Sequence, residues 1–142
     1  MFKPSKDEVR RFFCEAWAKS QSETVLSPME VIAVEWIREH PEYHADLMNL
    51  EEALTRDYGV DSGKSNPFLH LSMHLSIEEQ ISIDQPPGIR QAFARLAQRM
   101  DSRHAAMHEV MECLGEVLWR AQRDQQPIDG QAYVELVMRR LA

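Results

Sequence analysis

The sequence contains little of several residue types, and each shortage excludes a class of protein. Only two cysteines occur, Cys14 and Cys113, and neither has a second cysteine nearby. This count and spacing give no sign of a disulfide framework, a zinc ribbon or an iron-sulfur cluster, and we expect each thiol to be buried. The five glycines form no phosphate-binding loop or dinucleotide fingerprint, and no Ser-His-Asp arrangement is recognisable, so kinases, Rossmann enzymes and triad hydrolases have no support.

The charge balance and the lack of long apolar runs argue against two classes of partner, nucleic acid and membranes. Sixteen basic residues against 23 acidic residues give a net charge of -7, which argues against binding to nucleic acid or to an anionic membrane. No apolar run approaches the roughly 18 residues of a membrane-spanning helix, and the first residues lack the apolar centre of a secretory signal. We therefore expect a cytoplasmic protein that binds neither nucleic acid nor membrane. A protein partner or a homo-oligomer is left open.

The apolar residues recur at helical spacing, and no strand pattern is present. The sequence predicts an all-α fold, a single domain over residues 1–142, built as a mainly antiparallel bundle of four to five helices with one long helix in the C-terminal half. Helices are expected at residues 5–20, 27–40, 41–58, 66–85 and 89–123, with a short last helix after residue 130. Residues 59–65 are expected to form a loop.

Proline and the residue before it mark where helices begin. Ser27, Pro28 and Glu30 form the pattern of a capping box with proline in the first turn. Asn66 followed by Pro67 repeats this start. Pro41 disfavours helical geometry in His40, so one helical segment should end there and another should begin.

The placement of histidine is the most informative feature. All six histidines fall into three pairs spaced four residues apart, whereas chance predicts on the order of 0.2 such pairs. Residues four apart lie one turn apart on the same helix face, so paired imidazoles can bind one metal ion or two. The pairs are His40 and His44, His70 and His74, and His104 and His108.

The helix faces indicate which of these side chains point to the interior. At about 100° per residue, His104 lies about 20° and His108 about 60° from the apolar stripe of its helix, with Glu112 about 100° away. His70 and His74 lie among apolar residues and are followed one turn later by Glu78, so both helices read His, His, Glu in steps of four. The candidate metal ligands are His70, His74, His104 and His108, with Glu78 and Glu112 as carboxylates that bridge ions or orient imidazoles, and then His40 and His44.

A metal ion would satisfy several buried imidazoles and carboxylates together, since a buried polar group without a partner is costly. Neutral imidazole with carboxylate favours iron or zinc, with manganese, nickel or copper as further candidates. The sequence therefore predicts a non-haem, mononuclear or dinuclear metal site and leaves open whether it is catalytic. Two alternatives stay open: a metal-free helical adaptor or pH-sensitive interaction module whose buried histidines are hydrogen-bonded, and a bis-histidine haem protein.

Three strings in the chain carry a resemblance to a known family. These are HPEYH at residues 40–44, NPFLHLSMHLSIEEQ at residues 66–80 and DQPPGIR at residues 84–90. Together with HEVMECLGEVLWRAQR at residues 108–123, they resemble a bacterial family of small proteins known as a domain of unknown function. The resemblance implies a single-domain protein and supplies no catalytic residue.

Overall fold

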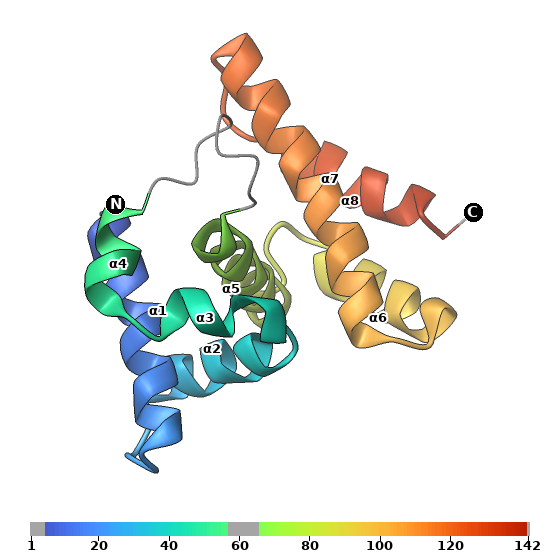
Figure 1. The fold of residues 1–142 in the computed structure, drawn as a ribbon. Helices are drawn as coiled ribbons and strands as arrows, with labels where there is room; N and C mark the ends of the chain where they lie inside the picture. The colour runs from blue at the N-terminus through green and yellow to red at the C-terminus, as the bar shows by residue number, and fades with distance from the viewer. Residues whose placement is uncertain (1–4, 57–65, 142) are drawn as a thin grey trace. The chain divides into compact units, whose positions relative to one another are not determined.

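The computed structural model describes residues 5–56 and 66–141, and within these residues every regular element is helical. The all-α prediction is confirmed for that part of the chain, and the predicted loop at residues 59–65 lies outside it. The elements, shown in Figure 1, are α1 (Lys6–Gln21), α2 (Pro28–Arg38), the 3-10 helix η1 (Pro41–Tyr43), α3 (His44–Leu47), α4 (Leu50–Thr55), α5 (Pro67–Ile83), α6 (Ile89–Met100), α7 (Arg103–Asp124) and α8 (Gly130–Arg139).

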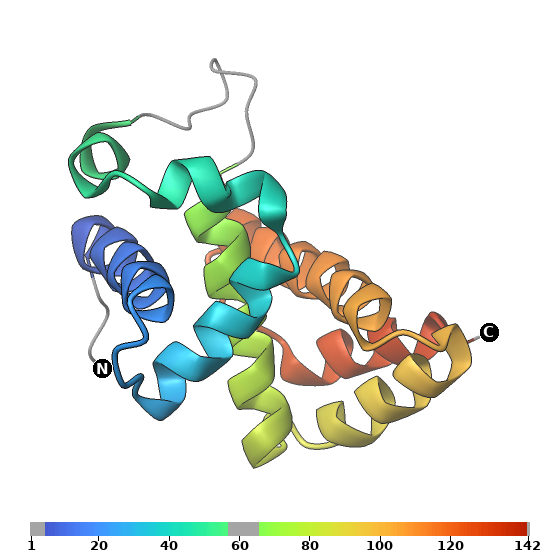
Figure 2. The ribbon, with the colours of Figure 1, turned by 60° about the horizontal axis from the view of Figure 1, so that its bottom comes forward.

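The chain divides into two compact units, Met1–Leu75 and Ser76–Ala142. The division falls inside α5, which Figure 2 shows as one uninterrupted helix. The single domain predicted from the sequence stays a prediction. Each unit is described by itself below.

In the first unit, α1 packs against α2, α3 and α4. The predicted capping box opens α2: the Ser27 hydroxyl accepts from the Glu30 backbone N–H at 3.2 Å, and the Glu30 carboxylate accepts from the Ser27 N–H at 2.9 Å. The Asn66 side chain caps α5 as predicted, by accepting the backbone N–H of Phe68 at 3.0 Å. The predicted helix over residues 41–58 is wrong for the residues that the structure describes, because η1, α3 and α4 stand in its place; residues 57 and 58 lie outside the described residues.

The second unit contains the end of α5 together with α6, α7 and α8, and these last three helices pack against one another. The DQPPGIR segment forms the turn between α5 and α6. The Asp84 carboxylate accepts the backbone N–H groups of Gly88 at 3.2 Å and Arg90 at 3.1 Å. The Arg90 guanidinium in turn donates to the backbone carbonyls of Ile81 at 2.9 Å and Ser82 at 2.7 Å, near the end of α5. Arg90 therefore has a structural role.

The prediction of one long helix over residues 89–123 is wrong, because the chain turns back between α6 and α7 (Figure 2). Asp101 adopts a left-handed conformation with φ of 52° and ends α6, while the Ser102 side chain accepts from the Ala105 N–H at 3.0 Å and begins α7. The apolar spacing continues across the break, which hid it in the sequence. A Schellman-type end followed by a serine cap is the physical reason for the division.

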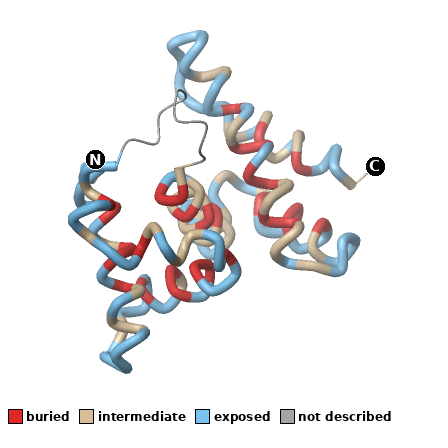
Figure 3. Tube along the Cα trace, viewed as in Figure 1, coloured by how far each residue is buried: buried red, intermediate tan, exposed pale blue. Residues whose placement is uncertain are grey.

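Apolar side chains on the inner faces form the core of each unit. Buried positions recur along α7 at helical spacing, as Figure 3 shows. Cys14 and Cys113 are both buried and free, as predicted. No helix among the described residues is long and apolar enough to cross a membrane. The largest fully buried side chains of the second unit include Ile77, Ile89, Leu96, Met107, Val110, Val117 and Tyr133.

Candidate metal centre

Three histidines of the first unit bring their Nε2 atoms together. His70 and His74 lie one turn apart on α5, and their Nε2 atoms are 3.0 Å apart. His40, which follows α2, places its Nε2 atom 3.1 Å from that of His74 and 3.3 Å from that of His70. His40 and His74 are buried, and His70 is half-buried. We call these three side chains the histidine triad.

The three contacts of the triad cannot all be hydrogen bonds. Each Nε2 atom carries either a proton or a lone pair, so it either donates or accepts. In a triangle of such atoms at most two of the three contacts can pair a donor with an acceptor. The third contact then faces two N–H groups or two lone pairs at 3.0 to 3.3 Å. The triangle is therefore poorly satisfied by its own hydrogen bonds, whatever the tautomers.

A metal ion resolves this conflict, because it accepts three lone pairs at once. Nitrogen atoms at about 2.0–2.1 Å from a metal lie about 3.3–3.4 Å apart in a tetrahedron and about 2.8–3.0 Å apart along an octahedron's edge. The observed separations of 3.0, 3.1 and 3.3 Å fall within this span. Histidines of the first unit thus lie close enough together to hold a metal ion, and His40 and His74 both belong to the residues that could ligate one.

The residues next to the triad hold its rings in place. The Glu42 carboxylate lies 2.9 Å from Nδ1 of His40, and this hydrogen bond holds the pKa of Glu42 below its ordinary value. The Tyr43 ring stacks on His40 with centroids 5.1 Å apart, and burial raises the pKa of its phenol, with the Glu42 and Asp46 carboxylates adding to the effect. The Trp36 ring stacks on His74 at 3.9 Å.

Sequence reasoning assigned no role to Glu42 or Tyr43. The signal was local and lay in the HPEYH string: proline after the first histidine produces a tight turn, and a tight turn brings residues two and three positions later back to the His40 ring. Helical spacing alone does not reveal such contacts.

His44 points away from the triad in the structure. Its Nε2–H donates to the backbone carbonyl of Ile37 at 3.0 Å, and its ring lies against Trp17 with centroids 4.4 Å apart. A 3-10 turn separates His40 from His44, so the two are not presented on one helical face. The four-residue spacing of this pair therefore does not bring the two imidazoles together, as it would in a continuous helix.

The second unit contains its own pair of histidines. His104 and His108 lie one turn apart near the start of α7, with Nε2 atoms 3.2 Å apart. Both are half-buried, and both belong to the residues that could ligate a metal. A single N–H···N hydrogen bond can satisfy this pair, and so can a chelated metal ion. The pair is thus compatible with metal binding without requiring it.

The two predicted carboxylates interact with arginines of the second unit. Glu78 forms a two-pronged ion pair with Arg103, whose Nη2 atom lies 2.9 Å from Oε2 of Glu78. Glu112 is exposed and lies 2.8 Å from the Arg140 guanidinium. Within that unit these ion pairs join α5 to α7, and α7 to the residue that follows α8. In this arrangement the carboxylates have structural roles.

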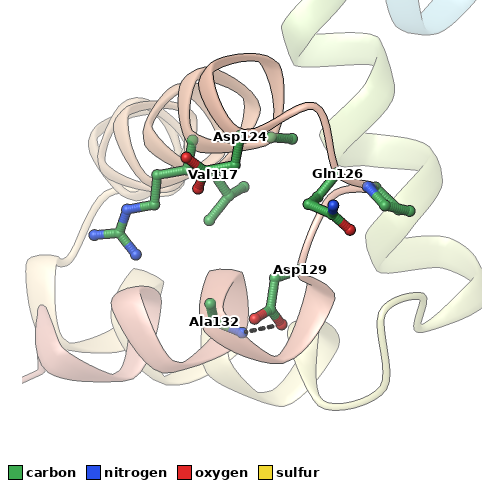
Figure 4. Close-up of a pocket in the computed structure, with 8 residues that line it drawn as sticks. Val117, Asp124, Gln126, Asp129 and Ala132 are labelled. Atoms are coloured by element: carbon green, nitrogen blue, oxygen red, sulfur yellow. Dashed lines mark hydrogen bonds between the residues drawn. The ribbon is translucent and has the colours of Figure 1, made fainter.

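A pocket of about 280 Å³ lies at the end of α7 and the start of α8, in the second unit (Figure 4). It is lined by Asp124, Gln126 and Asp129 among other residues. Asp129 caps α8 by accepting the Ala132 N–H at 3.0 Å, and Asp124 pairs with Arg123 at 2.9 Å. Both carboxylates thus have structural partners.

Comparison with known proteins places the chain in a family. No curated protein and no solved structure matches it. A family described as a domain of unknown function, DUF1841, matches residues 5–139, which include the triad, the HPEY turn and the His104 and His108 pair. Because this match covers nearly the whole sequence, the chain belongs to the DUF1841 family.

Proposed function

We propose that the protein binds a divalent transition metal and that His40, His70 and His74 are the core of the site. The observation that carries this proposal is the triangle of Nε2 atoms at 3.0 to 3.3 Å, which three hydrogen bonds cannot satisfy and one metal ion can.

The donor set favours iron or zinc, because neutral imidazole binds both well and no thiolate takes part. Three nitrogens fill three positions of a metal that takes four to six ligands. His104 and His108 are proposed as further metal ligands, since their Nε2 atoms are spaced to chelate an ion. The number of metal equivalents lost in variants of this pair tests whether the pair takes part in metal binding.

The remaining predicted ligands are left out of the proposed set. His44 donates its Nε2–H to the Ile37 carbonyl, and Glu78 and Glu112 are ion-paired with Arg103 and Arg140. Each would have to give up this partner to bind a metal.

The test is elemental mass spectrometry on protein purified without a histidine tag and loaded with iron(II) or zinc. We expect one or two equivalents in the parent protein. The substitutions His40→Ala, His70→Ala and His74→Ala should each remove an equivalent, whereas His44→Ala, at a half-buried histidine outside the triad, should leave uptake unchanged. Metal content below a tenth of an equivalent after loading, with all variants folded, overturns the proposal.

A metal-free interaction module is the alternative. The His104 and His108 contact is as compatible with this alternative as with metal binding, because one hydrogen bond satisfies that pair. Under this alternative, a chelator leaves the melting temperature of the parent protein unchanged. Each triad substitution then changes the stability by the same amount whether chelator is present or absent. We also propose that the protein is cytoplasmic, that it binds a protein partner or a second copy of itself, and that it binds neither nucleic acid nor membrane.

A further inference from the structure

Residues 40–43 form a tight turn that presents one imidazole. Pro41 disfavours the ordinary helical conformation for the residue before it, and His40 accordingly has φ of -128° and ψ of 68°. Pro41 then opens η1, and the Tyr43 N–H donates to the His40 carbonyl at 2.9 Å. The turn thus fixes the backbone of His40 at the end of α2 without continuing the helix.

The same turn supplies two contacts to the His40 ring. The Glu42 carboxylate oxygen lies 2.9 Å from Nδ1, and the Tyr43 ring stacks on the imidazole with 18° between the planes. One contact lies in the plane of the ring and the other lies on its face, so together they restrict rotation about both side-chain torsions.

The in-plane contact also decides where the proton sits. A carboxylate only accepts hydrogen bonds, so the 2.9 Å contact requires a proton on Nδ1 of His40. In the neutral ring Nε2 is then left with its lone pair, and Nε2 is the atom that meets His70 and His74. A carboxylate on the far nitrogen of a metal-bound histidine fixes the tautomer and strengthens the nitrogen as a donor.

We propose that Glu42 is a positioning residue of the metal centre, which holds His40 in the tautomer that directs an Nε2 lone pair at the other two triad histidines. This inference rests on the proposed function. Glu42 itself does not bind the metal, and its side chain is 58% exposed, so its replacement should leave the fold intact.

The experiment compares Glu42→Ala and Glu42→Gln with the parent protein. Glu35→Gln, at an exposed carboxylate on α2, is the control for loss of charge. Zinc affinity is measured by competition with a chelator of known affinity, and the His40 tautomer is read in metal-free protein from its ¹⁵N chemical shifts. We expect Glu42→Ala to weaken zinc binding about 10- to 100-fold. Glu42→Gln, which keeps an acceptor oxygen, should lose less, and Glu35→Gln should bind like the parent.

The two readouts distinguish positioning from a general effect on stability. In Glu42→Ala the Nε2-protonated tautomer of His40 should become populated, while the melting temperature of the metal-free protein stays close to that of the parent. Zinc affinity within twofold of the parent, or a His40 ring that keeps its proton on Nδ1, overturns the inference alone. Absence of zinc and iron uptake by the parent protein overturns the proposed function and this inference with it.

Discussion

The Nε2 atom of His74 lies 3.0 Å from that of His70, one turn earlier on α5, and the two imidazoles converge with His40 from outside that helix. A metal bound at this point joins α5 to the end of α2. Metal binding should therefore stabilise the folded chain, since the unfolded chain does not hold these three nitrogens together.

The first prediction concerns this link between metal and stability. At a free metal concentration about 100-fold above Kd, the bound ion should add about 2.7 kcal/mol to the free energy of unfolding. Differential scanning calorimetry with metal and with excess chelator measures the difference. His70→Ala should abolish the metal-dependent rise in melting temperature, whereas His44→Ala should keep it. Equal rises in parent and His70→Ala would place the stabilising ion elsewhere.

The second prediction concerns Arg10, a buried arginine of α1 that supports the first unit. Its Nη1 atom donates to the backbone carbonyls of Ala53 and Arg56, both at 2.7 Å, at the end of α4. Arg10→Ala removes charged hydrogen bonds from a site that is only 3% exposed. The free energy of unfolding, measured by urea denaturation, should therefore fall by about 1.5–3 kcal/mol.

The control for Arg10 is Arg11, whose side chain is 52% exposed and lies 3.9 Å from Glu15. Arg11→Ala should change the free energy of unfolding by no more than about 0.5 kcal/mol. A loss in Arg10→Ala as small as that in Arg11→Ala would contradict the role given to the Arg10 bonds.

Several parts of the fold follow from the sequence because they depend on local chemistry. Ser27 with Glu30 and Asn66 before Pro67 cap their helices as predicted, since a cap needs only its own few residues. The break at Asp101 was not predicted. The residue that ends the helix in a left-handed conformation is an aspartate and not a glycine, and the apolar spacing continues past it.

The candidate site could be predicted only where helices are continuous. His70 with His74 and His104 with His108 are paired as the four-residue spacing indicated, because each pair lies within one helix. His44 is turned toward Ile37, because the 3-10 turn after Pro41 breaks that spacing. The contact of Glu42 with His40 depends on the geometry of that turn, which a helical projection does not include.

The third prediction concerns the pH dependence of stability through Glu30. The Ser27 backbone N–H and then the Lys19 ammonium hold the pKa of Glu30 below its ordinary value. Such a carboxylate stabilises the fold at pH values above its unfolded pKa, and the contribution is lost as the pH falls through its lower folded pKa. Parent protein should therefore be more stable than Glu30→Gln at pH 7, and the difference should shrink under acid.

Melting temperatures of both proteins between pH 7 and pH 3 measure this, with Glu35→Gln on the same helix as the control. A difference between parent and Glu30→Gln that stays constant over this range, or grows as the pH falls, would show that the Glu30 charge does not act through these bonds.

The fourth prediction concerns the two thiols. Burial raises the pKa of Cys14 to about 11, and burial also raises the pKa of Cys113. Because the thiolate is the reactive form, both cysteines should react slowly with a disulfide reagent such as DTNB at pH 8 in native protein. In denaturant, two thiols per chain should react within the mixing time. Rapid labelling of either cysteine in the native state would contradict its burial.

The most direct test of the central claim is X-ray absorption at the metal edge of protein loaded with zinc or iron(II). The account predicts at least three imidazole nitrogens at about 2.0–2.2 Å, recognisable from the scattering of the outer ring atoms, and loss of this imidazole shell in His40→Ala, which should no longer hold that ion. A first shell of oxygen or sulfur atoms without imidazole, or a shell unchanged in His40→Ala, would contradict it.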